Sequence, residues 1–213
     1  MESPLRFLAF GDSLTAGFYN YGLSYHPYAI KLLNLFSSVN IPITVDQKGI
    51  PGECVVPSMI NRIENLLFTE KPPHYDWIIV LGGINDLAYK RSAETIFNQG
   101  LKQIYDMILQ RKNLNIKLSV MTIIENGFYA PESTYDKQRQ ILNDMIRNYV
   151  KNCQDQNRIC LIDIDKYINY HSNKDINQRD TIWDDYVHLT PDGYDLMGKI
   201  IFEEIFNKIN QQS

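Results

Sequence analysis

Five short apolar runs alternate with longer amphipathic segments along this chain, and this alternation constrains the fold more than any other feature. The apolar runs cover residues 5–10, 43–47, 77–81, 118–123 and 160–164. The segments that follow them carry apolar residues at helical spacing, over 27–37, 56–68, 93–110, 135–153 and 191 to about 209. Alternating strands and helices favour a parallel sheet covered on both faces. The pattern predicts an α/β fold, namely a three-layer α/β/α sandwich. Its five-stranded parallel sheet is expected to have a flavodoxin-like strand order.

Length and charge narrow the classes of protein that such a fold can serve. The 213 residues suit one domain spanning residues 1–213. The formal net charge is -4 and the lysines and arginines form no stripe, so no nucleic-acid partner is expected. No apolar run is long enough to span a bilayer, so no membrane span is expected. The expected partner is a small-molecule substrate, and the sequence leaves the oligomeric state open.

The cysteines and the N-terminal residues give information on the cellular location of the protein. Cys54, Cys153 and Cys160 are odd in number and lack metal-ligand spacing, which predicts free thiols in a reducing compartment. Residues 1–10 lack a charged region followed by a long apolar one, so no secretory signal is expected. These features predict a cytoplasmic location. A secreted protein whose signal had been trimmed would have the same sequence features.

A serine directly follows the first predicted strand. Gly11-Asp12-Ser13 is turn chemistry, so Ser13 is expected where the chain leaves the sheet. The carboxyl edge of an open α/β sheet is where ligands bind. Gly-Asp-Ser is also an ordinary loop sequence, and a neutral hydroxyl is a weak nucleophile. Ser13 therefore becomes a functional candidate only if a base reaches it.

His188, just before the last predicted helix, offers that base. It follows Asp185 by three residues, and a carboxylate so placed can hold an imidazole in one tautomer through a single hydrogen bond. Asp184 could take the same part, and either acid could instead be a solvated residue ahead of the helix. Serine, imidazole and carboxylate are the minimum set for acyl transfer, so Ser13, Asp185 and His188 are predicted to be catalytic.

Acyl transfer also needs donors for the oxyanion that develops on the attacked carbonyl. Pro51-Gly52 fits the central pair of a type II turn that points an amide outward, although a plain turn has the same sequence. Asn85 offers a side-chain amide after a glycine pair; its alternative is an Asx turn or a helix cap, with Asp86 a comparable cap. The predicted oxyanion hole combines the amides of Ser13 and Gly52 with the side chain of Asn85.

Four short blocks resemble the SGNH (GDSL) hydrolase family, in the family's order and over nearly the whole chain. The blocks are Gly11-Asp12-Ser13-Leu14, Gly52, Gly83-Ile84-Asn85-Asp86 and Asp185-Tyr186-Val187-His188. The resemblance implies the α/β/α fold and ester hydrolysis with no cofactor and no metal. It implies Ser13 as nucleophile, His188 as general base and then acid, and Asp185 as orienting acid. The same three donors form the implied oxyanion hole, and Asp12 is read as a local hydrogen-bonding residue outside the triad.

Apolar and aromatic residues close to these blocks predict the substrate pocket. The candidates, each of which could instead pack the core, are Phe18, Tyr21, Leu87, Phe128 and Tyr186. The predicted loops are short and leave little material for a lid, which favours short-acyl or acetyl esters. A lysophospholipase or thioesterase, a carbohydrate deacetylase and an acyltransferase remain open on the same triad.

Two other classes of protein fit the same scaffold. The first is a catalytically idle domain that binds an ester or a sugar; the intact triad residues count against it, and an assay with p-nitrophenyl acetate separates the two. The second is a flavodoxin-like nucleotide binder. It is disfavoured because the turn after the first strand has no Gly-x-Gly-x-x-Gly pattern and no Walker lysine. The sequence therefore favours an ester hydrolase and leaves the acyl chain and the alcohol undetermined.

Overall fold

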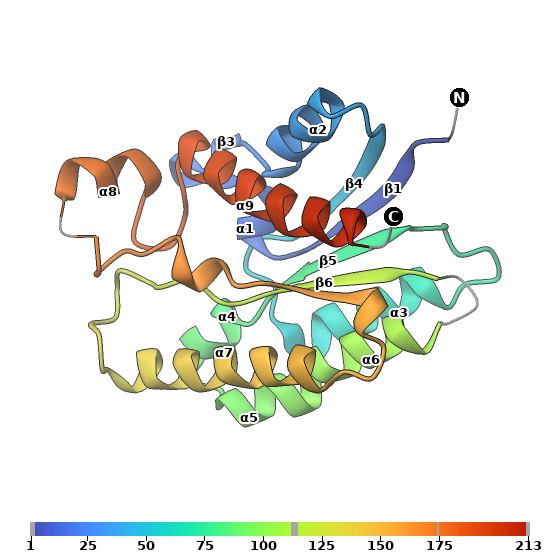
Figure 1. The fold of residues 1–213 in the computed structure, drawn as a ribbon. Coiled ribbons are helices and arrows are strands. Elements are labelled where there is room, and N and C mark those ends of the chain that lie inside the picture. Colours follow the sequence, from blue (N-terminus) through green and yellow to red (C-terminus); the bar gives the residue numbers. More distant parts are fainter. Residues whose placement is uncertain (1–2, 112–114, 174, 212–213) are drawn as a thin grey trace.

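The computed structural model describes residues 3–111, 115–173 and 175–211, and a parallel sheet runs through their centre (Figure 1). The strands of this sheet are β1 (Leu5–Gly11), β4 (Ile43–Gly49), β5 (Trp77–Leu81), β6 (Lys117–Met121) and β7 (Ile159–Ile162). They lie in the order β4-β1-β5-β6-β7, and every neighbouring pair is parallel. The predicted five-stranded, flavodoxin-like sheet is confirmed, and its strands start or end within two residues of the predicted runs.

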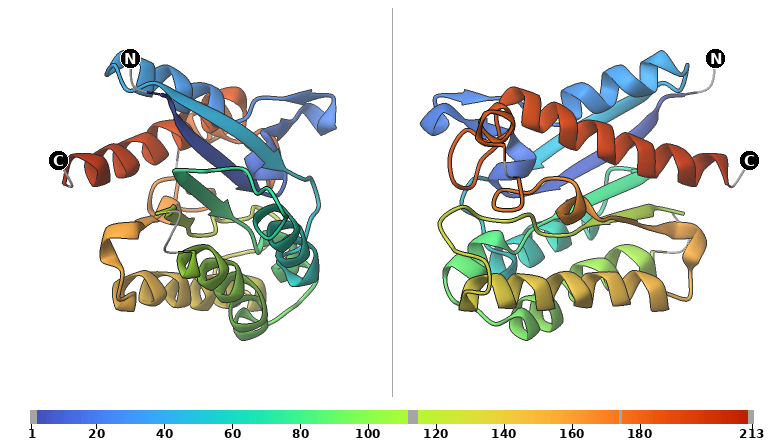
Figure 2. Two further views of the ribbon diagram at one scale, coloured as in Figure 1. Left: turned by 90° about the vertical axis from the view of Figure 1, so that its right-hand side faces the viewer. Right: turned by 60° about the vertical axis from the view of Figure 1, so that its left-hand side comes forward.

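Helices cover both faces of the sheet. On one face, α2 (Ala29–Ser38) and α9 (Pro191–Asn210) pack side by side (Figure 1). The other face is covered by α3 (Ile60–Leu67), α6 (Lys102–Gln110) and α7 (Thr134–Asn152), as Figure 2 shows from two further sides. Every residue of the central strand β5 is buried between these layers. Because both faces of this strand are covered, every position is apolar, and this continuous apolar run is what predicted the strand.

Local signals fix the starts of the two longest helices. Thr190 caps α9 by accepting a hydrogen bond from the Gly193 amide, and Pro191 fills the first turn, where its missing N–H costs nothing. Ser133 caps α7 in the same way through the amide of Asp136. The cap of α9 matters for the site because the loop that carries His188 ends there.

Wider turns interrupt two of the predicted helices. The helix predicted over 93–110 consists of α5 (Ala93–Ile96), the π-helical turn η3 (Phe97–Leu101) and α6. The helix predicted over 56–68 begins with the π-helical turn η2 (Val55–Met59) before α3. The two π turns pack against each other at Gly100, where an added Cβ would lie 2.7 Å from a side-chain carbon of Val55. Packing of one segment on another therefore overrides the simple helical period here.

The carboxyl ends of the strands gather on the side opposite the start of β1 and the end of α9 (Figure 1). Two elements that the sequence did not predict extend this edge: the hairpin of β2 (Phe18–Tyr19) and β3 (Ser24–Tyr25), and the helix α8 (Ile176–Ile182). The expectation of short loops is therefore wrong for the connections after β1 and β7, which supply chain on both sides of the site.

The cysteines are free thiols, as predicted for Cys54, Cys153 and Cys160. Cys160 is buried on β7 with its sulfur 3.0 Å from the Ser119 hydroxyl oxygen, and burial raises the pKa of its thiol to about 11. It therefore serves as a neutral residue of the core. Within the described ranges, the helices are too short or too polar to cross a membrane.

Candidate active site

Ser13 lies at the end of β1 on a one-turn helix. Asp12 caps this helix, α1 (Ser13–Ala16), by accepting a 3.0 Å hydrogen bond from the Leu14 amide, and Gly17 ends it with a φ of 75°. This cap sets Ser13 at the first helical position, whose amide has no intrahelical acceptor. Ser13 is only 4% exposed, so its hydroxyl is largely withdrawn from solvent.

His188 reaches Ser13 from a segment near the other end of the chain. Its Nε2 lies 3.1 Å from Ser13 Oγ, and its Nδ1 lies 2.9 Å from Asp185 Oδ2. With the ring proton on Nδ1, the imidazole donates to Asp185 and can accept the proton of Ser13. Asp184 does not compete for this place, because its carboxylate accepts a hydrogen bond from the Asn20 amide. The structure thus brings Ser13, His188 and Asp185 into one hydrogen-bonded relay.

The loop before α9 fixes the carboxylate of this relay. Asp185 Oδ1 accepts hydrogen bonds from the amides of Val187 and His188, both at 2.6 Å. Burial alone would raise the pKa of Asp185, but the hydrogen bonds from the His188 ring and these two amides outweigh it and hold the pKa below its usual value. The carboxylate is therefore ionised at neutral pH and can stabilise a protonated imidazole.

The hairpin after α1 supplies the aromatic neighbour of the base. The ring of Phe18 lies against the imidazole of His188, with centroids 4.5 Å apart. Phe18 itself is held by an edge-on contact with Tyr25, and its backbone carbonyl accepts a hydrogen bond from the Tyr194 hydroxyl. Phe18, one of the predicted pocket residues, therefore packs directly against the base of the triad and restricts how the imidazole can turn.

A type II turn follows β4, as the Pro51-Gly52 pair predicts. The Glu53 amide donates to the Ile50 carbonyl at 3.2 Å, and Gly52 has a φ of 77°, a value that suits glycine best. An added Cβ at Gly52 would meet no heavy atom within 4 Å. Backbone conformation rather than crowding therefore accounts for glycine here, and the turn borders open space in which a ligand could lie.

The side chains of Asn85 and Asp86 tie the turn after β4 to the short helix α4 (Ile84–Ala88). Asn85 Nδ2 donates to the Glu53 carbonyl at 2.9 Å, which leaves a second N–H of that amide for another acceptor. Asp86 is fully buried and accepts from the amides of Val55 at 2.7 Å and Val56 at 3.3 Å. Neither side chain caps α4. The capping alternative weighed for both residues is therefore wrong.

A second carboxyl lies beside the relay without joining it. Asp12 is fully buried, and its Oδ2 has no hydrogen-bond partner within the described part of the chain. Burial raises the pKa of Asp12 to about 7, although the Leu14 amide and the charge of His188 oppose the rise. Asp12 therefore acts locally, as the cap of the helix that carries Ser13.

Asp12 should make the stability of the fold depend on pH. An unfolded aspartate has a pKa of about 3.9, whereas the folded value is raised to about 7. Its contribution to the free energy of unfolding is therefore present at low pH and lost as the pH rises through that folded value. Chemical denaturation at about pH 5 and about pH 8 should show a larger loss in the wild type than in Asp12→Asn, which does not titrate. Equal losses would contradict the raised pKa.

The predicted pocket residues do not share one cavity. Tyr21, which is 89% exposed, and Tyr186 line a cavity of about 490 Å³ that also borders Asp185. Phe128 packs against Tyr186 with ring centroids 4.6 Å apart. Leu87 is almost fully buried and lines another cavity, of about 590 Å³.

Two further rings line the Asp185 cavity, and sequence reasoning missed that of Tyr170. Tyr170 and Trp183 line it beside Tyr21 and Tyr186, and they pack edge to face with centroids 5.2 Å apart. Trp183 stands two residues before Asp185, which marks it in the sequence, whereas Tyr170 stands fifteen residues before Asp185 and has no such signal. These rings surround the outer side of the triad acid.

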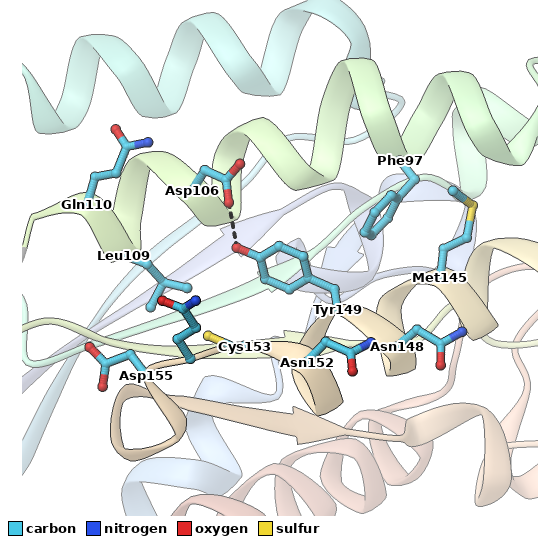
Figure 3. A pocket seen from close by; sticks show the side chains of 11 residues that line it. Phe97, Asp106, Leu109, Gln110, Met145, Asn148, Tyr149, Asn152, Cys153 and Asp155 are labelled. Atoms are coloured by element: carbon cyan, nitrogen blue, oxygen red, sulfur yellow. Dashed lines mark hydrogen bonds between the residues drawn. The ribbon is translucent and has the colours of Figure 1, made fainter.

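A further hollow lies between α6 and α7, away from the relay. It measures about 560 Å³, and Figure 3 shows its lining, including the hydrogen bond of 2.7 Å from the Tyr149 hydroxyl to Asp106. None of the site residues predicted from the sequence lines this hollow. The chemistry inferred for this chain is therefore confined to the carboxyl edge of the sheet.

Solved structures with the same fold cover almost the whole chain. The family 3 carbohydrate esterase of Clostridium thermocellum is 21% identical with a TM-score of 0.72, and the match covers 99% of each chain. The acetylxylan esterase Axe2 of Geobacillus stearothermophilus is 19% identical, with a TM-score of 0.70 over 95% of this chain and 94% of that one. A lipase/acylhydrolase of Enterococcus faecalis is 17% identical, with a TM-score of 0.67 over 93% and 94%. No curated protein matches the chain in sequence.

Fold and sequence together define the class of this protein as a hydrolase of the SGNH type. The family model described as GDSL-like Lipase/Acylhydrolase matches residues 9–196. The chain belongs to the GDSL-like lipase/acylhydrolase family, and the family predicted from the four sequence blocks is confirmed.

Proposed function

We propose that this protein is a serine esterase that hydrolyses carboxylic esters through an acyl-enzyme intermediate. The observation that carries the proposal is the relay of two hydrogen bonds, 3.1 Å from Ser13 to His188 and 2.9 Å from His188 to Asp185. A serine hydroxyl, an oriented imidazole and a carboxylate held by hydrogen bonds, in this order, are the parts that acyl transfer requires. The match to an acylhydrolase family supports the same reaction.

The reaction runs in two halves that use the same groups. Ser13 Oγ attacks the ester carbonyl carbon while Nε2 of His188 takes its proton, and Asp185 stabilises the resulting imidazolium. The tetrahedral adduct collapses when its bond to the alcohol oxygen breaks, and the alcohol leaves with the proton from Nε2. Water then attacks the acyl-enzyme in the same manner, which releases the carboxylic acid and restores Ser13.

Three donors are proposed for the oxyanion of both tetrahedral adducts. They are the amide of Ser13, the amide of Gly52 and the side-chain amide of Asn85. The open space beside Gly52 and the second N–H of Asn85 support this role. Donors fixed before the reaction stabilise the developing charge without any reorganisation.

The proposed substrates are esters with short acyl groups, acetyl esters in particular. Solved structures of similar fold support this choice because they include an acetylxylan esterase and a carbohydrate esterase. p-Nitrophenyl esters of graded chain length test it directly. Values of kcat/KM should be highest for acetate and fall as the chain grows; a maximum at long chains would favour the lysophospholipase or thioesterase alternative.

A carbohydrate deacetylase is the second candidate, and the cavity beside Asp185 favours it. Aromatic rings and the carboxylates of Asp180 and Asp184 line this cavity, and such groups suit sugar rings and hydroxyls. Release of acetate from an acetylated xylo-oligosaccharide, compared with p-nitrophenyl acetate, tests the candidate. A higher kcat/KM on the sugar ester would establish it, and turnover of the small ester alone would reject it.

The rate should fall at acidic pH, because a protonated imidazole cannot act as the base. Only the neutral ring can accept the proton of Ser13, while Asp185 is already ionised because its pKa lies below the usual value. The profile of kcat/KM against pH should therefore rise to a plateau and show no separate loss of activity from Asp185 near neutrality. A rate that does not fall at acidic pH would argue against His188 as the base.

A further inference from the structure

Arg62 occupies a central place behind the proposed oxyanion hole. It lies in the first turn of α3, and its guanidinium carbon is 4.0 Å from the centroid of the Phe10 ring near the end of β1. Its side chain is 22% exposed, and that of its ion-pair partner Glu53 is 8% exposed. The pair is thus largely shielded from water. In such a shielded environment charged hydrogen bonds are strong, and an unpaired charge is costly.

The guanidinium group of Arg62 bonds the ends of two strands. Nη1 donates to the Lys48 carbonyl of β4 at 2.7 Å, and Nη2 donates to the Gly11 carbonyl of β1 at 3.0 Å. Gly11 stands two residues before Ser13, and Lys48 stands just before the turn that carries Gly52. One planar cation therefore links the backbone that leads to the nucleophile with the backbone that leads to the proposed oxyanion donor.

Glu53 extends this link to the third donor. Nε of Arg62 lies 3.0 Å and 3.1 Å from the two carboxylate oxygens of Glu53, and Nη2 donates to the same carboxylate. The backbone carbonyl of Glu53 accepts the hydrogen bond from Asn85 Nδ2 at 2.9 Å. The chain from Arg62 through Glu53 thus ends on Asn85, and Glu53 itself directly follows Gly52.

We propose that Arg62, through Glu53, is a positioning residue that holds the Ser13 turn, the Gly52 turn and Asn85 in register for the tetrahedral adduct. The inference rests on the proposed esterase function. The fork of a guanidinium can meet a carboxylate and two carbonyls at once, whereas an ammonium is a point charge without that geometry. Charge alone at this position therefore does not suffice.

Arg62→Lys is the decisive variant because it keeps the charge and removes the fork. We expect kcat on p-nitrophenyl acetate to fall roughly 10- to 100-fold with KM within about threefold, because the oxyanion forms only in the transition state. Affinity for a boronic acid, which forms a tetrahedral adduct with the serine, should fall by a similar factor. Glu53→Gln should lower kcat by a smaller factor, again with little change in KM. This variant tests the positioning role if Arg62→Lys does not fold.

Arg158 provides the matched control. It is 6% exposed and donates to the carbonyls of Ile116 at 2.9 Å and Leu109 at 3.0 Å, at the amino edge of the sheet, away from the relay. Arg158→Lys should lower the melting temperature and leave kcat and boronate affinity within about threefold of the wild type. A drop in Arg158→Lys as large as in Arg62→Lys would show that any buried arginine matters equally, and would overturn the inference.

Two more results would overturn the positioning role. They are wild-type kcat and boronate affinity in both Arg62→Lys and Glu53→Gln, or a change confined to KM. Absence of Ser13-dependent hydrolysis in the wild type would instead refute the proposed function. Boronate binding needs no turnover, so the comparison of affinities still decides the role of Arg62 in that case.

Discussion

Replacing Ser13 with alanine should reduce ester hydrolysis to the uncatalysed background. The hydroxyl oxygen of Ser13 is the atom that His188 Nε2 faces at 3.1 Å, and its loss removes the nucleophile. For a residue that forms the covalent intermediate, we expect a loss in kcat of roughly 10⁴-fold or more. The measurement is p-nitrophenyl acetate hydrolysis at high enzyme concentration, together with labelling by a fluorophosphonate, which should disappear completely.

The fold should survive this change, so the loss can be assigned to chemistry. Ser13 is a small residue in the first turn of α1, and the cap from Asp12 to the Leu14 amide does not involve its side chain. Ser119→Ala is the matched control, because Ser119 is a buried serine on β6 whose hydroxyl lies within hydrogen-bond distance of the Cys160 thiol, away from the relay. Ser119→Ala should keep its activity and its labelling. Turnover retained by Ser13→Ala would remove the nucleophile assignment.

The strands could be predicted because a strand that is buried on both faces consists of consecutive apolar residues. All five residues of β5 are buried and apolar, so this strand stands out from every other segment. The hairpin of Phe18–Tyr19 and Ser24–Tyr25 has two residues per strand, too few for any alternation to be seen. The π turn at Phe97–Leu101 also could not be predicted from the sequence. Its position depends on the packing of Gly100 against Val55 and not on the local sequence.

The site was predictable only in its chemical groups. Ser13, Asp185 and His188 follow from the chemistry of residue types at strand ends and loop positions. The roles of Asp86 and Arg62 could not be predicted in this way. From neighbouring residues alone, a carboxylate after Asn85 is expected to cap a helix, and an arginine in a helix is expected on its solvated face. Arg91, which pairs with Asp86, is close to it in sequence. Glu53, Val55 and Gly11 lie nine or more residues from the side chains that they bond, and only the folded chain brings them together.

Replacing Asn85 with alanine should lower kcat by roughly 100- to 1000-fold, as the loss of a single oxyanion donor does in other acyl-transfer enzymes. KM should change little, because the developing oxyanion exists in the transition state and not in the bound ester. Steady-state kinetics on p-nitrophenyl acetate separate the two parameters. Fluorophosphonate labelling of Ser13 should slow as well, because it also passes through a charged oxygen.

The hydrogen bond from Asn85 to the Glu53 carbonyl offers a competing explanation, namely that alanine merely loosens the turn after β4. Gln47→Ala is the matched control, because Gln47 also donates its side-chain amide to a backbone carbonyl, that of Thr15 at 3.1 Å. Gln47→Ala should keep kcat within about threefold. A comparable fall in both variants would mean that tying the loops together, not stabilising the oxyanion, is what Asn85 contributes. An unchanged rate in Asn85→Ala would remove it from the oxyanion hole and leave the two backbone amides to carry the charge.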